Sequence, residues 1–244
     1  MLSIRFAKLA ALFAAVSTVV AAPAQKRQDS CADVHIFLAK GWNEPYPGRQ
    51  GKLAGSICWS LDSCDYEDIW FSNTPEDNYC DSVTQGAASG VAQMTAYAQR
   101  CPDSKLVLSG YSQGANVAGD IIGGGGGPFG TPSCEIGWSA GLSRNSSPGN
   151  KIAAVLLFGD TRHVGGKPYN HLNGASISSW NPRTPEALVQ FDTYADRIRS
   201  FCVQSDAVCA ASGPGPFVDD DHLNYFDRYT DEAAGWVRWR LTQQ

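Results

Sequence analysis

The segment 105–115, KLVLSGYSQGA, restricts the possible fold of this chain more than any other part of the sequence. A short apolar run ends in Gly110-Tyr111-Ser112-Gln113-Gly114 and passes into small, helix-compatible residues, which is the form of a nucleophile elbow. In so tight a turn, a Cβ at either flanking glycine would collide with the neighbouring strand or helix. We therefore predict a reactive Ser112 at the apex. The alternative is a Gly-rich turn without a chemical role, because such a pentapeptide also arises by chance.

The beginning of the chain is typical of a segment that is removed on export. A basic start precedes an apolar run that is too short to span a bilayer, and small residues follow it. This pattern predicts a signal peptide over 1–22. The dibasic pair Lys26-Arg27 predicts a short propeptide over 23–27 and a single mature domain over 28–244. We expect this domain to be secreted and extracellular.

The predicted mature chain is acidic. Without the four basic residues of the first 27, it has 15 basic and 24 acidic side chains, a formal charge of −9. Such a surface repels phosphate backbones and anionic lipid, so neither nucleic acid nor a membrane is an expected partner. No internal repeat or long linker divides the chain, and we expect one domain and a monomer.

Apolar runs alternate with helical patterns along the mature chain. Strands are predicted at 34–40, 69–71, 106–109, 152–158 and 198–203. Helices are predicted at 82–100, from the elbow to about residue 122, and from Thr230 as the capping residue onward. This alternation predicts an α/β fold, a three-layer α/β/α sandwich with a central parallel sheet.

The five glycines at 123–127, followed by Pro128, are interpreted as a flexible surface loop, because glycine is costly to order. A phosphate-binding loop is disfavoured, since no Lys-Ser or Lys-Thr pair follows the run.

A serine nucleophile needs a base, and the base needs a carboxylate that fixes its tautomer. Of the four histidines, His35 is expected inside a strand, and His163 and His171 are expected at the surface of a polar loop. His222 leaves room for a separate acid loop upstream. It is therefore the predicted base if the order along the chain is nucleophile, acid, base.

Several aspartates lie between the serine and this histidine. The candidates by order are Asp160, Asp192, Asp196, Asp206 and Asp219 to Asp221. Asp206 stands between Cys202 and Cys209, and a disulfide closing so short a loop would hold the carboxylate rigidly. The alternative is an ordinary turn aspartate.

These motifs resemble the fungal cutinase and acetylxylan esterase family. The resemblance is carried by the elbow, by the Cys-x-x-x-Asp-x-x-Cys loop over 202–209, by the late His222, and by cysteines just ahead of two strands. It implies a compact α/β-hydrolase without a large lid that hydrolyses esters through an acyl-enzyme. It also implies Ser112 as nucleophile, Asp206 as acid and His222 as base. Neither a cofactor nor a metal is expected.

All eight cysteines lie in the predicted mature chain, and an even number in a secreted chain predicts four disulfides. The resemblance implies Cys31–Cys101 and Cys202–Cys209, local spacing suggests Cys58–Cys64, and Cys80–Cys134 remains. Zinc is disfavoured because no C-x-x-C pair occurs. Asn145-Ser146-Ser147 is a predicted glycosylation site.

Ester hydrolysis also needs hydrogen-bond donors for the oxyanion of the tetrahedral intermediate. The backbone N–H of Gln113, which follows the nucleophile, is the first. In the family, the second comes from a Ser or Thr in the loop after the first strand. Here Trp42 occupies that position and Asn43 follows, so the donor is a backbone N–H of Trp42 or an added side-chain amide of Asn43.

The leading hypothesis is a serine esterase that removes acetyl groups from plant cell-wall polysaccharide, because the cysteine number and Gly-rich segments look like the acetylxylan esterase branch. A cutinase or short-chain lipid esterase acting on cutin-type esters is the alternative. A non-catalytic binding protein on the same fold is another, since fold does not entail activity. A metal-dependent deacetylase would rest only on the cluster Asp219 to His222.

Overall fold

A six-stranded sheet is the centre of the structure, a computed structural model that describes residues 31–211, 213 and 216–243. In spatial order the strands are β2 (Cys64–Asp68), β1 (Val34–Ala39), β3 (Lys105–Tyr111), β6 (Ile152–Phe158), β8 (Ile198–Phe201) and β7 (Asn170–His171). Every neighbouring pair is parallel. The expected signal peptide, the propeptide and the start of the mature chain lie outside the described residues.

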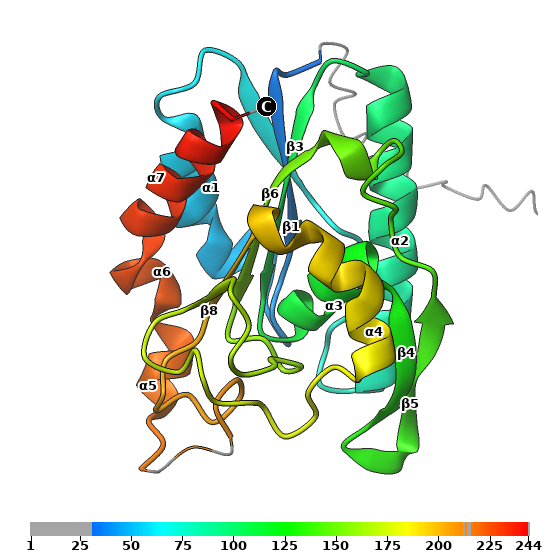
Figure 1. Ribbon diagram of the computed structural model, residues 1–244, viewed down its shortest axis with the longest axis vertical. Coiled ribbons are helices and arrows are strands. Elements are labelled where there is room, and N and C mark those ends of the chain that lie inside the picture. The colour runs from blue at the N-terminus through cyan, green and yellow to red at the C-terminus, as the bar shows by residue number, and fades with distance from the viewer. Residues whose placement is uncertain (1–30, 212, 214–215, 244) are drawn as a thin grey trace, which may run out of the picture. The chain divides into compact units, whose positions relative to one another are not determined.

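Helices cover both faces of this sheet (Figure 1). One face carries α1 (Gly51–Cys58) and α7 (Thr230–Leu241), and the other carries α2 (Tyr79–Arg100), α3 (Gln113–Gly123) and α4 (Pro185–Phe191). The short helical segments are α5 (Asp219–Leu223), α6 (Tyr225–Arg228), η1 (Gly48–Gln50), η2 (Gly149–Lys151) and η3 (Asp192–Arg197). The predicted three-layer α/β/α sandwich is confirmed. In the described part of the chain, no helix is both long and apolar enough to cross a membrane.

The inner strands are apolar at nearly every position because helices bury both of their sides. In β3, Leu106 and Leu108 pack into the cluster under α2 and α3, whereas Val107 packs into the cluster under α1 and α7. Burying one such side chain stabilises the fold by about 1.5–3 kcal/mol. This is why the strands predicted at 34–40, 106–109, 152–158 and 198–203 are found close to their predicted bounds.

The prediction of a strand at 69–71 is wrong, because the strand lies directly before these residues. The edge strand beside β1 is β2, and Ile69 and Phe71 are buried just beyond its end. β2 lies at the edge of the sheet, where its side chains stay partly exposed and are mostly polar. The last helix needs a smaller correction: Tyr229 stands at its N-cap, and the Thr230 hydroxyl donates instead to the Phe226 carbonyl.

The glycine run is not a flexible loop. Gly125–Phe129 forms strand β4, which pairs antiparallel with β5 (Thr131–Ser139). Gly124, Gly125 and Gly127 have positive φ angles, which glycine adopts without strain. The cross-strand pairing, together with a disulfide from β5 to α2, supplies the order that the local sequence lacks.

The cysteines of the described chain are all paired, and none is free. The four disulfides are Cys31–Cys101, Cys58–Cys64, Cys80–Cys134 and Cys202–Cys209, the pairs expected from the sequence. They join the start of β1 to the end of α2, α1 to β2, α2 to β5, and the two ends of the loop after β8.

Two helical glycines provide a test of this packing. A Cβ at Gly55, in α1, meets no atom within 4 Å, whereas a Cβ at Gly86, in α2, would lie 2.9 Å from both methyl carbons of Val117 in α3. We expect Gly55→Ala to raise the free energy of unfolding by about 0.5–1 kcal/mol, because alanine restricts the unfolded chain. Gly86→Ala should lower it by about 1–3 kcal/mol through overpacking. Urea unfolding of both variants measures this, and an equal change in the two would contradict the packing described.

Candidate active site

Ser112 stands at the turn between β3 and α3, with φ 54° and ψ −120°. Such a conformation is strained for a residue other than glycine, and it persists only where the surroundings fix it. The Ser112 N–H donates to the Phe158 carbonyl of β6 at 2.9 Å. A Cβ at Gly110 would lie 2.7 Å from the Cα of Ala115, and one at Gly114 would lie 2.5 Å from the Lys40 carbonyl oxygen. The two glycines therefore permit the close packing that the elbow needs.

Three distant segments bring Ser112, His222 and Asp206 together. His222 Nε2 lies 2.9 Å from Ser112 Oγ, and His222 Nδ1 lies 2.9 Å from Asp206 Oδ2. Ser112 follows β3, Asp206 lies in the loop after β8, and His222 lies in α5, a short helix rather than the loop expected from the sequence. The three side chains form a continuous hydrogen-bonded series.

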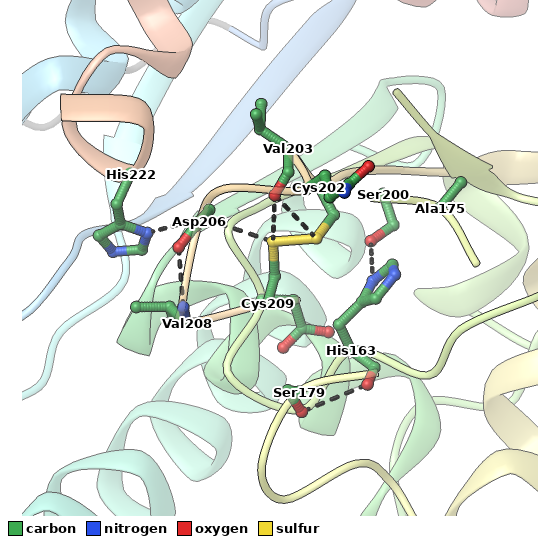
Figure 2. Close-up of a disulfide and its surroundings, with 12 residues drawn as sticks. His163, Ala175, Ser179, Ser200, Cys202, Val203, Asp206, Val208, Cys209 and His222 are labelled. Carbon is green, nitrogen blue, oxygen red and sulfur yellow. Dashed lines mark hydrogen bonds and ion pairs between the residues drawn. A yellow bond between two sulfur atoms is a disulfide. The ribbon is translucent and has the colours of Figure 1, made fainter. Parts of the chain in front are cut away.

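The loop that carries Asp206 is closed by the disulfide Cys202–Cys209, and Figure 2 shows the carboxylate between Val208 and His222. Its second oxygen, Oδ1, accepts a hydrogen bond from the Val208 N–H at 2.8 Å. Asp206 is completely buried. A buried carboxylate must be compensated by donors, and this loop provides one of them from its own backbone.

Tyr225, three residues after His222, provides another donor that the sequence analysis did not identify. Its hydroxyl donates to Asp206 Oδ2 at 2.7 Å and accepts from the Val203 N–H at 3.1 Å. Burial, and then the charge of Asp206, raise the pKa of Tyr225 well above its usual value, so the phenol stays protonated and donates. Tyr225 is thus placed as a positioning residue for the carboxylate.

Gly159 is a second position found only in the structure. Its φ is +55°, and a Cβ there would lie 2.8 Å from the His222 ring and 3.0 Å from Asp206 Oδ2. The end of β6 therefore needs glycine both for its backbone conformation and for the space that the pair of side chains occupies. The only signal in the sequence was the glycine that follows an apolar strand.

The loop after β1 lies against the elbow, where a Cβ at Gly114 would meet the Ala39 and Lys40 carbonyls. The backbone N–H groups of Gln113 and Trp42 donate to no other residue in the described chain. The N–H of Asn43, by contrast, donates to the Asn73 carbonyl at 2.7 Å, and Asn43 has a positive φ of 54°. Of the three residues predicted as oxyanion donors, Gln113, at the N-terminus of α3, and Trp42 therefore keep an unbonded backbone N–H in the described chain.

Buried polar side chains hold this loop in place, and no local sequence pattern indicates this role. The Glu44 carboxylate accepts from the Gly41 N–H at 3.0 Å and pairs with Arg49. The Asn73 amide donates to the Gly41 carbonyl at 2.6 Å, and the Gln50 amide donates to the Ala39 carbonyl at 2.8 Å.

The other histidines have partners of their own. His35 pairs with Asp65, and His171 pairs with Glu232. The expectation that His163 lies at the surface is wrong, because it is 2% exposed and its Nδ1 lies 3.1 Å from Ser200 Oγ. Burial lowers the pKa of His163 to about 4, so it is neutral at neutral pH.

Four of the competing aspartates have cationic partners elsewhere, with Asp160 bound to Arg183, Asp192 to Lys167, Asp196 to Arg144 and Asp221 to Arg228. Asp219 and Asp220 are exposed. Among the described residues, no group of three or more His, Cys, Asp or Glu side chains could hold a metal ion. The Asn145 side chain of the predicted glycosylation site lies at the exposed surface.

The parallel sheet, the elbow after β3 and the hydrogen-bonded Ser–His–Asp series are those of an α/β-hydrolase. A family model described as Cutinase matches residues 30–241. The chain is 32% identical to the cutinase CUT1 of Coprinopsis cinerea, over 97% of this chain and the whole of that protein. It is 30% identical to an acetylxylan esterase of Hypocrea jecorina over 68% of this chain, but this match spans only half the length of that relative.

A solved structure, the catalytic core domain of the acetyl xylan esterase from Trichoderma reesei, has a similar fold. Its TM-score is 0.74 at 23% identity, with 86% of this chain and all of that domain covered. The chain belongs to the cutinase family, a family of carboxylic ester hydrolases.

Replacing Tyr225 tests its role as a positioning residue. We expect Tyr225→Phe to lower kcat on a soluble ester about tenfold with little change in KM, because a hydrogen bond to a charged group contributes about 1.5–3 kcal/mol and about 1.4 kcal/mol is tenfold in rate. Tyr229→Phe is the matched control, since the Tyr229 hydroxyl donates to no residue of the described chain. Equal kcat values in the two variants, both folded by circular dichroism, would show that Tyr225 does not position the carboxylate.

Proposed function

We propose that this chain is a secreted serine esterase in which Ser112, His222 and Asp206 form the catalytic triad. The observation that carries the proposal is the unbroken hydrogen-bonded series from Ser112 Oγ through the imidazole to the buried carboxylate. A serine hydroxyl is a weak nucleophile until a base accepts its proton. In this geometry the carboxylate holds the proton of the ring on Nδ1, which leaves Nε2 free to accept the proton from serine.

The reaction then runs in two halves. As Ser112 Oγ attacks the ester carbonyl, His222 Nε2 takes the serine proton, and it passes this proton to the alcohol that leaves. The acyl group remains on Ser112 Oγ as an ester. His222 next takes a proton from water, whose oxygen attacks the acyl carbon, and Ser112 leaves with the proton restored. Asp206 stays ionised and stabilises the imidazolium formed in each half.

The negative charge that develops on the carbonyl oxygen is assigned to the backbone N–H groups of Gln113 and Trp42. Both are unpaired in the described chain, and the first stands at a helix N-terminus, where the aligned peptide dipoles favour an anion. Donors that are preorganised for the oxyanion typically contribute several kcal/mol to catalysis. Trp42 supplies its N–H irrespective of its side chain, so the absence of a hydroxyl in the loop does not remove the second donor.

The preferred substrate is an acetyl ester on plant cell-wall polysaccharide, as in the relative named acetylxylan esterase. The number of cysteines and the Gly-rich hairpin support this choice. A cutin-type or short-chain lipid ester is the second candidate, and the full-length match to a cutinase favours it.

The four disulfides support an extracellular location. The protein is further proposed to act as a monomer and to need no nucleic acid, membrane or cofactor.

Loss of the nucleophile tests the triad. We expect Ser112→Ala to lower kcat by about 10⁴-fold or more and to abolish labelling by a fluorophosphonate, because no other group can form the acyl-enzyme. The fold should be unchanged, since the Ser112 side chain makes no capping hydrogen bond to α3. Folded wild-type protein that neither reacts with the probe nor hydrolyses esters would instead support a non-catalytic binding protein.

Acyl-chain preference tests the substrate. We expect the rate on p-nitrophenyl esters to be highest for acetate and to fall at butyrate and beyond, with acetate released from acetylated xylan. An apolar pocket distinguishes substrates that differ by one methylene group by about 10–200-fold at best, so the rate should fall stepwise with acyl-chain length. A maximum at butyrate or longer, with hydrolysis of cutin and no acetate from xylan, would favour the cutinase alternative.

A further inference from the structure

A groove of about 680 Å³ lies between the β4–β5 hairpin and α4, on the same side of the sheet as α2 and α3 (Figure 1). We call it the hairpin groove. Its lining includes the glycines 125–127 of β4, Trp138 of β5 and Val189 of α4. These two apolar side chains are 80% and 74% exposed. Neither Ser112, Asp206 nor His222 is among its described lining residues.

Trp138 faces outward because β5 contains a bulge. Ile136 is buried, and in a regular strand the side chain two residues later would also point into the core. Instead Gly127 pairs with Ile136 and Gly125 pairs with Ser139, so that one residue of β4 faces two residues of β5. A bulge of this kind redirects side chains and is frequent beside functional sites.

The glycine run makes this bulge possible. A Cβ at Gly126, the single residue opposite the bulge, would lie 2.8 Å from the Ile136 carbonyl oxygen and 2.9 Å from the Cα of Trp138. A side chain at this position would therefore push the two strands apart. Glycines of the run that was expected to be a loop thus line the groove and permit the bulge that turns the Trp138 side chain outward.

The hairpin wall is fixed to α2 at several points. The disulfide Cys80–Cys134 joins the two elements, and the Gly137 N–H donates to Thr84 Oγ1 at 2.7 Å. Phe129 stacks on Tyr79 with ring centroids 4.6 Å apart. A wall held in this way loses little conformational freedom when a ligand binds, which favours affinity.

We propose that the hairpin groove binds an uncharged segment of a polysaccharide chain, at a site separate from the triad. The flat indole of Trp138 fits the apolar C–H face of a sugar ring, and the lining carboxylates Glu135 and Glu186 accept hydrogen bonds from sugar hydroxyls. The proposal depends on the proposed function only in that a polymeric substrate makes such a site useful.

The lining argues against other ligands. It includes two carboxylates and, among its described residues, no Lys or Arg, so an anionic polymer or an anionic lipid surface would be repelled. A peptide strand added to the edge of the hairpin would meet Pro128 in β4, which has no N–H to donate to a ladder. A neutral ligand rich in hydroxyl groups meets neither obstacle.

Substitutions at Trp138 test the proposal by binding to insoluble xylan. Measured in a Ser112→Ala background, Trp138→Ala and Trp138→Leu should weaken binding about tenfold, since the aromatic anchors of a binding surface dominate its affinity. Trp138→Tyr should keep most of it. Trp59→Ala is the matched control, because Trp59 is 91% exposed at the end of α1 and lies outside the groove. With Ser112 intact, all of these variants should hydrolyse p-nitrophenyl acetate at the wild-type rate.

The outcomes separate this site from the triad. Binding that is equal in Trp138→Ala and Trp59→Ala overturns the groove assignment, as does binding by Trp138→Leu that matches Trp138→Tyr, which would indicate an apolar ligand. A chain that hydrolyses no ester but binds xylan through Trp138 contradicts the proposed function and leaves the groove assignment standing. A chain that hydrolyses esters and does not bind xylan contradicts the groove assignment alone.

Discussion

The buried carboxylate of Asp206 is the constraint on which the site depends. A charge removed from water is tolerated only where donors replace its hydration, and here three do so: His222 and Tyr225 at one oxygen and the Val208 N–H at the other. The disulfide Cys202–Cys209 fixes the loop that carries the charge, and Gly159 leaves room for the imidazole. Removing any one partner would leave part of this charge uncompensated.

The opposite side of the site is built on close backbone packing rather than on charge. Gly114 lies against the loop after β1 so closely that no side chain fits between them. This contact sets the amide of Gln113 beside the loop that carries the amide of Trp42. Glu44, Gln50 and Asn73 then hold the loop by hydrogen bonds to its backbone. The proposed oxyanion site thus depends on packed backbone, and the proposal assigns a backbone N–H, not a side chain, to Trp42.

The sequence predicted the inner sheet well and its periphery poorly. The strands β1, β3 and β6 are continuous apolar runs, because they are buried on both faces, and such runs are visible without any partner. β2 was placed one segment too late because an edge strand keeps polar side chains, and β4 was missed because glycine has no strand preference of its own. Both strands are ordered by pairing with a neighbour, β2 with β1 and β4 with β5, and the local sequence does not reveal this pairing.

The sequence alone predicted an elbow at Ser112, because glycines at 110 and 114 permit so tight a turn, and it left open whether this serine is reactive. It also limited the base to a late histidine. The acid, by contrast, had several candidates by order; the short loop between two cysteines favoured Asp206, and the resemblance to a family selected it. The tertiary structure decided that this carboxylate reaches the imidazole, that Tyr225 supports it, that His163 is buried, and that Trp138 faces a groove. Each of these depends on contacts between segments distant in the chain, and these contacts form only when the sheet and its helices are packed.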